Sequence, residues 1–218
     1  MSPWAPCSAR DVLPPPAAPA APAAPAAPAA PRGPAGRSSV TPMAEAGAHK
    51  LGPENSKLIV RAYREGAAAK LGHDLVIEVT SWQGVLEIGE DGAATSAELT
   101  ADSRSLEVRE GVGGAKALSD KDRADIKGSI DKKILQGSQI SFRSTDIRTS
   151  GDGSYSVRGD LELVGTTRPI TFLVSLDAGG HATASAQVTQ SEWGIKPFSA
   201  MLGALKVRDT VDVELSPR

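Results

Sequence analysis

One stretch of the chain, residues 155–176, constrains the fold more than any other. Apolar and polar side chains alternate over residues 155–163, which is typical of a β-strand with one buried face. A glycine and two threonines at residues 165–167 interrupt the alternation, and a second alternating run follows at residues 170–176. Two strands this close in sequence pair antiparallel as a hairpin. An isolated hairpin is only marginally stable in water, so its apolar face requires more sheet.

The alternating pattern recurs on both sides of this hairpin. Further strands are predicted at residues 57–64, 73–89, 97–108, 139–148, 181–190 and 205–215. With each long bent strand counted once, the chain has eight strands. The prediction is an all-β fold, an eight-stranded closed antiparallel barrel whose interior can hold one small ligand.

The strand predicted for residues 73–89 contains a change of alternation. Its apolar positions are odd-numbered up to Val79, and after Trp82 and Gly84 they are even-numbered, as at Leu86. A glycine inside a strand where the alternation changes indicates a bulge or a sharp bend. Long bent strands are what a closing barrel requires.

One short helical segment is predicted at residues 119–135. Ser119, with Asp122 three residues later, resembles a capping box at a helix start. Gly128 lowers the helix propensity by about 1 kcal/mol relative to alanine, so two short helices are the alternative. Apolar residues recur at i, i+4 and i+8, which places them in one stripe along a helix; they are Ile126, Ile130 and Ile134. This segment and the apolar loop 193–204 are expected at one end of the barrel.

The first part of the chain has a different composition. Residues 17–31 are five Ala-Ala-Pro triplets, and twelve of the sixteen prolines precede Met43. Such a segment favours polyproline II and cannot build a core. The predicted organisation is therefore a disordered tail, residues 1–49, before one folded domain, residues 50–218. Met43 is the hypothesised biological start.

Charge and hydropathy limit the partners. The chain from Met43 onward has 21 basic and 25 acidic side chains, a net charge of −4, which argues against nucleic acid as a partner. No apolar run reaches the 18 residues of a membrane-spanning helix. The N-terminal residues also lack the charged start and apolar core of a secretory signal. We therefore expect a cytoplasmic protein.

No constellation of catalytic or metal-binding residues is visible. The three histidines lack metal-ligand spacing, and Cys7 is the single cysteine, within the proline-rich part. Neither a nucleophile elbow nor a phosphate-binding glycine motif occurs. His73 and Asp74 are adjacent and would point to opposite faces of a strand. The sequence thus predicts a protein that is not an enzyme and has no metal site and no cofactor.

Four segments in this order carry a resemblance to a known family. They are Leu71-Gly-His-Asp-Leu75, the run Val157-Arg-Gly-Asp-Leu-Glu-Leu-Val-Gly-Thr-Thr-Arg-Pro-Ile170, and Trp193-Gly-Ile-Lys with Leu205-Lys-Val-Arg-Asp-Thr-Val-Asp-Val213. Over residues 56–216 the chain resembles the YceI-like family of bacterial lipid-binding proteins. The resemblance implies a lipocalin-like barrel that holds a polyisoprenoid chain in an elongated apolar pore, without enzyme chemistry. Many family members are periplasmic, which is the alternative to a cytoplasmic location.

The predicted function is binding of a long apolar lipid, a polyisoprenoid or an isoprenoid quinone, inside the barrel. The alternative is an interaction or stress-response module whose barrel is filled by its own side chains. The sequence does not decide between a monomer and a homodimer. Strand alternation and the distribution of aromatic residues give the candidate ligand-binding side chains: Leu75, Ile77, Val79, Trp82, Phe142, Tyr155, Leu161, Phe172, Val174, Ala184, Trp193 and Phe198.

Overall fold

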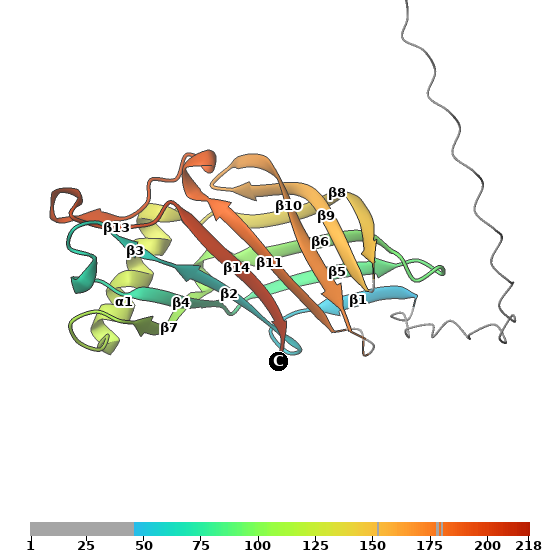
Figure 1. Cartoon of the computed structure of the whole chain (residues 1–218), viewed down its shortest axis with the longest axis horizontal. Coiled ribbons are helices and arrows are strands. Elements are labelled where there is room, and N and C mark those ends of the chain that lie inside the picture. Colours follow the sequence, from blue (N-terminus) through green and yellow to red (C-terminus); the bar gives the residue numbers. More distant parts are fainter. Residues whose placement is uncertain (1–45, 152, 178, 180) are drawn as a thin grey trace, which may run out of the picture. The chain divides into compact units, whose positions relative to one another are not determined.

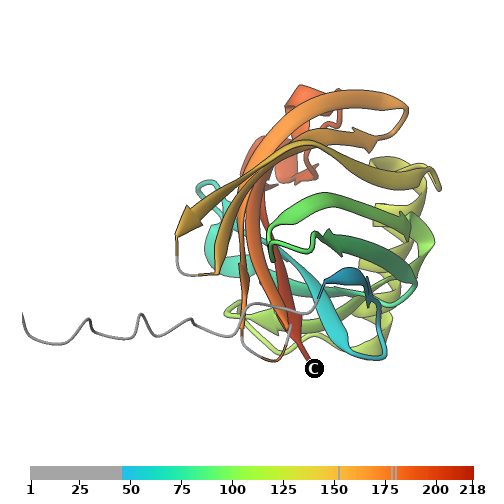
Figure 2. The same ribbon diagram turned by 90° about the vertical axis from the view of Figure 1, so that its right-hand side faces the viewer.

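The computed structural model describes residues 46–151, 153–177, 179 and 181–218. Their main element is an antiparallel sheet of 11 strands in the order β1-β5-β6-β8-β9-β10-β11-β14-β2-β4-β7. This sheet curls strongly, as two perpendicular views show (Figures 1 and 2), and its inner face carries the apolar core. A second sheet has three short strands in the order β12-β13-β3. The predicted all-β class is therefore confirmed. The predicted closed barrel is wrong, because β1 and β7 end the strand order and do not pair with each other, so the described residues form a curled half-barrel.

The strands of the main sheet are β1 (Gly47–Leu51), β2 (Ser56–Ala62), β4 (Asp74–Val79), β5 (Trp82–Ile88), β6 (Ala94–Asp102), β7 (Leu106–Val112), β8 (Gln139–Gly151), β9 (Ser154–Leu163), β10 (Thr166–Leu176), β11 (Ala182–Thr189) and β14 (Thr210–Pro217). Those of the second sheet are β3 (Arg64–Glu65), β12 (Ser199–Ala200) and β13 (Leu205–Val207). The helical elements are η1 (Ala69–Leu71), η2 (Ser103–Ser105), α1 (Asp120–Ser129), the π-helical turn η3 (Ile130–Ile134), η4 (Gln190–Trp193) and η5 (Met201–Gly203).

The predicted hairpin is the pair β9–β10. Leu163 pairs with Thr166 across a two-residue turn, Val164-Gly165, and both turn residues have positive φ, at 49° and 71°. Positive φ at both central residues is the geometry that matches the twist of the flanking strands. The alternation predicted for residues 155–163 also appears in the burial, because Tyr155 and every second residue after it are buried along β9.

The strand predicted for residues 73–89 is two strands, β4 and β5, that meet at a corner. The amide of Thr80 donates a hydrogen bond to the Ser105 carbonyl, and the amide of Asp102 donates to the Ser81 carbonyl, each at 3.0 Å. The neighbouring strand turns at the same corner, where η2 separates β6 from β7. A bend was thus correctly expected, although it lies at residues 80–81 and not after Gly84.

The expected number of eight strands is wrong. Two long bent strands are divided at the corner, into β4 and β5 and into β6 and β7. β1 adds a further strand at the edge, paired with β5. These differences have one cause: pairing with distant strands decides where a strand ends, and alternation within a segment does not show it.

Part of the predicted tail is ordered sheet. Residues 47–49 were placed in the tail, whereas they form most of β1, with Gly47 opposite Ile88 and Leu51 opposite Gly84. Residues 1–45 of the predicted tail, which include Cys7 and the hypothesised start at Met43, lie outside the described residues.

The helical prediction is confirmed at its first turn. The Ser119 hydroxyl accepts a hydrogen bond from the Asp122 amide, and the Asp122 carboxylate accepts one from the Ser119 amide, which is a reciprocal capping box. α1 continues directly into η3, so the stripe predicted from residue 126 to residue 134 lies on one continuous helical segment. α1 and the short strands β3 and β13 gather at the left end in Figure 1.

Candidate ligand cavity

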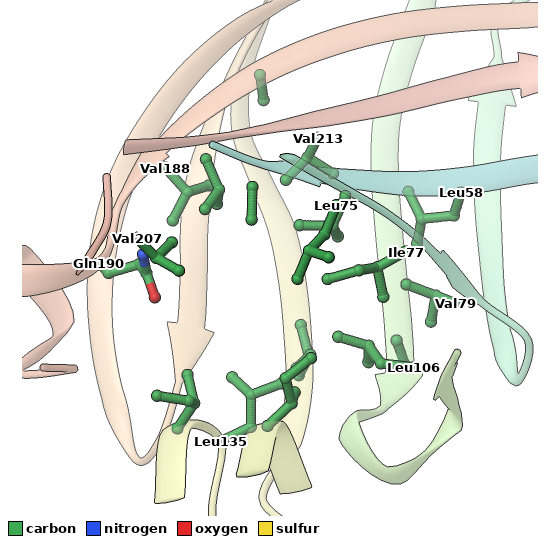
Figure 3. A pocket seen from close by; sticks show the side chains of 18 of the residues that line it. Leu58, Leu75, Ile77, Val79, Leu106, Leu135, Val188, Gln190, Val207 and Val213 are labelled. Carbon is green, nitrogen blue, oxygen red and sulfur yellow. The ribbon is translucent and has the colours of Figure 1, made fainter. Parts of the chain in front are cut away.

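An apolar cavity of about 930 Å³ lies inside the curled sheet. Its size falls within the range of roughly 300–1,000 Å³ that small-molecule sites span. Leu75, Ile77 and Val79 of β4 project into it, and Val213 of β14 and Leu106 of β7 approach it from other strands of the sheet (Figure 3). The alternation of β4 thus places one complete face on the cavity wall.

The helical segment closes one side of the cavity. Ile126, Ile130 and Ile134 line it and pack against the core. The ammonium group of Lys127 donates hydrogen bonds to the carbonyls of Arg104, at 2.7 Å, and Leu106, at 3.0 Å. These bonds fix α1 to the start of β7, so the isoleucine stripe faces the cavity.

Two phenylalanines from non-adjacent strands meet on the cavity wall. The rings of Phe142 in β8 and Phe172 in β10 have centroids 5.2 Å apart and are tilted by 58°, an arrangement typical of favourable aromatic pairs. Gly159 of β9, the strand between them, leaves the space that the Phe142 ring occupies. The glycine in the predicted signature segment therefore has a packing role.

Small residues widen the cavity along β11. Ala182, Ala184 and Ala186 all line it, as does Val188 at the end of the strand. Ala184 pairs with Val174 on one side and with Leu215 on the other, and both partners also line the cavity. The face of alanines was expected to leave space inside the sheet, and here it does.

Polar groups gather at one end of the cavity, where Arg64, His73 and Lys116 line it. The Arg64 guanidinium donates to the Gly72 carbonyl at 2.6 Å, and Nε2 of His73 lies 2.7 Å from the Lys116 carbonyl oxygen. Exposed Leu71 and Phe198 line the same end. The cavity therefore reaches the surface here, between loops that these hydrogen bonds hold together.

Asp122 also lines this end of the cavity. Hydrogen bonds from the hydroxyl and the backbone amide of Ser119 hold the pKa of the Asp122 carboxyl below its ordinary value. The carboxyl group is thus charged at neutral pH, and it caps α1. Its role is structural, and it adds a negative charge beside the basic groups of the opening.

Most of the predicted site residues lie on the cavity wall. Those that do are Leu75, Ile77, Val79, Phe142, Leu161, Phe172, Val174, Ala184 and Phe198. Contact between these side chains and a ligand stays a prediction.

Three predicted residues, all aromatic, do not line this cavity. The Tyr155 hydroxyl donates to the Gly92 carbonyl at 3.0 Å, and the Trp193 indole donates to the Leu161 carbonyl at 3.0 Å, both in buried positions. Trp82 borders a separate pocket of about 370 Å³. Alternation shows that a side chain points inward, but not at which level of the sheet it lies or whether its polar atom has a buried partner.

Part of the cavity wall was not predicted from the sequence. The isoleucines of the helical segment were recognised as an apolar stripe but not as lining residues, and Arg64 was not considered. The helical spacing was the available signal for the isoleucines. No local signal marks Arg64, because the loops that it joins come together only in the folded chain.

No group of three or more His, Cys, Asp or Glu side chains that could hold a metal ion occurs among the described residues. In the same part of the chain, none of the helices has the length and apolar character needed to cross a bilayer.

Fold and cavity together define a class, the barrel-like β-proteins with an apolar internal cavity. The model of the YceI-like domain matches residues 52–217 of the chain. This match covers most of the sequence, so the chain belongs to the YceI-like family. Among curated proteins, none matches the chain in sequence.

Several solved structures are similar to this chain, BcnA and a polyisoprenoid binding domain among them. BcnA of Burkholderia cenocepacia is 18% identical, with a TM-score of 0.55 over 74% of this chain and 94% of that protein. A polyisoprenoid binding domain from Saccharophagus degradans, implicated in plant cell wall breakdown, is 11% identical, with a TM-score of 0.51 over 79% of this chain and 97% of the domain. At these identities the similarity shows the shared fold.

Proposed function

We propose that this protein binds one long apolar lipid, a polyisoprenoid or an isoprenoid quinone, inside the curled sheet and does not convert it chemically. The observation that carries the proposal is the continuous apolar cavity of about 930 Å³. Family membership supports it, as does the similar Saccharophagus degradans domain, which is described as polyisoprenoid binding.

The apolar character of the wall favours an apolar chain as the ligand. Aliphatic side chains from β2, β4, β11 and β14 face the helical stripe, and the aromatic pair is part of the same wall. Each methylene group transferred from water contributes about 0.8 kcal/mol. Several isoprene units can thus supply strong binding, and affinity is expected to rise with chain length and to depend weakly on salt.

The cavity also distinguishes this proposal from a barrel filled by its own side chains. A filled barrel leaves no interior volume, because protein interiors are packed as densely as organic crystals. The alternative function, an interaction module without a ligand, does not account for the alanine face of β11.

Narrowing the cavity at the alanine face tests the proposal. Ala184→Leu adds volume to the wall without adding polarity, and we expect it to weaken binding of long prenyl chains roughly tenfold, since about two methylene groups are displaced. Short chains should lose less affinity. Titration with prenyl alcohols of increasing length, presented in detergent, measures this.

A matched control places the same side chain on the other face. Ser185→Leu lies one residue further along β11, where the side chain is exposed, and we expect it to bind every chain length as the parent does. If Ala184→Leu also binds all lengths like the parent, the ligand is not in this cavity.

A further inference from the structure

Large apolar side chains are exposed beside the cavity opening. Phe198, Met201 and Leu202 lie on the segment that contains β12 and η5, and Leu71 ends η1. Leu202 is fully exposed and Met201 is 58% exposed. Exposed apolar groups gathered in one place on a soluble protein indicate an interaction site.

These side chains belong to one structural unit, which we call the tip and define as residues 64–72 and 196–207. The Ala68 amide donates to the Ala204 carbonyl at 2.8 Å, and the Val207 amide donates to the Phe198 carbonyl at 2.9 Å. β13 pairs with β3 and with β12. The tip lies at the left end in Figure 1.

The backbone of the tip holds two of these side chains in an uncommon conformation. Met201 and Leu202 both have positive φ, at 52° and 54°, a region that residues with a side chain rarely adopt. Such conformations concentrate at functional sites. Here they occur at the two most exposed apolar side chains of the tip.

The tip is also basic. It contains Arg64, Lys70, Lys196 and Lys206 against one acidic residue, Glu65, a net charge of +3, whereas the whole chain carries −2. The three lysines are exposed. A unit that exposes both apolar side chains and lysines is complementary to a bilayer with anionic head groups, which attracts basic groups near its surface.

We propose that the tip docks onto an anionic lipid bilayer, with Met201 and Leu202 inserted among the lipids and the lysines at the head groups. Leu71, Phe198 and Lys206 line the cavity as well, so the docked surface is continuous with the opening. An apolar chain then passes from the bilayer into the cavity without crossing water. Docking itself does not require the proposed cargo.

A second copy of the chain fits the tip less well. A stable protein interface buries about 800 Å² on each partner, over roughly 20–30 residues. The tip offers four large apolar side chains on short connections, which suits a fluid apolar phase better than a rigid complementary surface.

The test is flotation of the full chain with vesicles of phosphatidylglycerol and phosphatidylcholine. We expect the parent to bind these vesicles and the double variant Met201→Asn/Leu202→Asn to bind at least tenfold more weakly. Asparagine tolerates positive φ, so the variant keeps the backbone of the tip. Leu173→Ser is the matched control: Leu173 is 57% exposed on β10, outside the tip, and its loss should leave vesicle binding unchanged.

Substitution of the lysines provides a second test of the proposal. Replacing Lys70, Lys196 and Lys206 by glutamine should weaken binding to anionic vesicles by roughly fivefold for each lysine and have little effect on pure phosphatidylcholine vesicles. Parent-like vesicle binding by the asparagine variant overturns the proposal. So does a parent dimer in size-exclusion chromatography that the same variant dissociates, because the tip then binds a second copy.

Uptake of a prenyl alcohol distinguishes a failure of membrane docking from a failure of the lipid-binding function proposed above. The asparagine variant should take up the alcohol from detergent as the parent does, but slowly from vesicles. A parent that binds vesicles and never takes up the alcohol contradicts the lipid-binding function and leaves docking standing. Equal uptake from vesicles by parent and variant overturns the transfer route.

Discussion

The two ends of the curled sheet are built from the same alternating strands but are filled differently. Near the β5–β6 turn, at the right of Figure 1, Ile88, Tyr155 and Val157 are buried and none of them lines the cavity. At the opposite end, exposed Leu71 and Phe198 border an open cavity.

β9 contains this contrast within one strand. Tyr155 and Val157 belong to the filled end, whereas Leu161 and Leu163 line the cavity, with Gly159 between the two pairs. All of these positions point inward. Side-chain size and hydrogen bonding, and not alternation, therefore decide where the interior is solid and where it is hollow.

Truncation at the two ends should have unequal costs, and this is the largest expected effect. Tyr155→Ala removes a ring and a buried hydrogen bond, so we expect it to lower the free energy of unfolding by about 3–5 kcal/mol. Leu161→Ala should cost only about 2 kcal/mol, because its side chain already borders empty space. Urea unfolding followed by tryptophan fluorescence measures both, and equal losses would mean that the two ends are equally filled.

Substitution of Gly159, which lies between the two ends, should have an intermediate effect on stability. A Cβ at Gly159 would clash with the Arg143 carbonyl oxygen and the Phe142 ring, so Gly159→Ala should destabilise the fold by about 1–3 kcal/mol and push the ring into the cavity. Gly128→Ala in α1 is the control, since its Cβ meets nothing within 4 Å. The control should raise stability by about 0.4–1 kcal/mol in the same urea titration, and a neutral Gly159→Ala would refute the packing role.

The smallest effect concerns charges on the outer surface of the sheet. Burial raises the pKa of Glu78, but the guanidinium groups of Arg109, at 2.7 Å, and Arg218, at 2.6 Å, outweigh it and lower the pKa overall. A lowered folded-state pKa contributes stability above the ordinary glutamate pKa, and this stability is lost as the pH falls through the folded value.

Glu78→Gln removes this contribution. The variant should be about 1 kcal/mol less stable than the parent at pH 7, and the difference should vanish in strong acid. Urea midpoints at several pH values between 7 and 2 test it. A difference that is constant across this range would show that a neutral hydrogen bond, and not the charge, is responsible.

Much of the fold was predictable because its signals are local. The hairpin of β9 and β10, the capping box at Ser119 and the alanines of β11 follow from alternation, capping chemistry and residue size. The division at Thr80 and Ser81 was misplaced, because Asp102 at the end of β6 and Ser105 in η2 fix it from another part of the chain. β1 was missed because its burial is shallow and only its pairing with β5 makes it a strand.

For the candidate site, the sequence predicts which side chains point inward, but not which of them line the cavity. Phe142, Phe172 and Ala184 were placed inward and line the cavity, whereas Tyr155 and Trp193 were placed inward and form hydrogen bonds within solid protein. Their partners, the carbonyls of Gly92 and Leu161, are far away in sequence. The polar end of the cavity is likewise assembled by loops that meet only after folding.

The measurement that tests the central claim most directly is native mass spectrometry of the purified protein, with lipid extraction of the same sample. The hollow interior predicts an additional mass that matches one lipid molecule per chain, that is apolar on extraction, and that a denaturing spectrum releases. A parent that gives only the mass of the polypeptide, even after incubation with prenyl alcohols in detergent, would contradict the account.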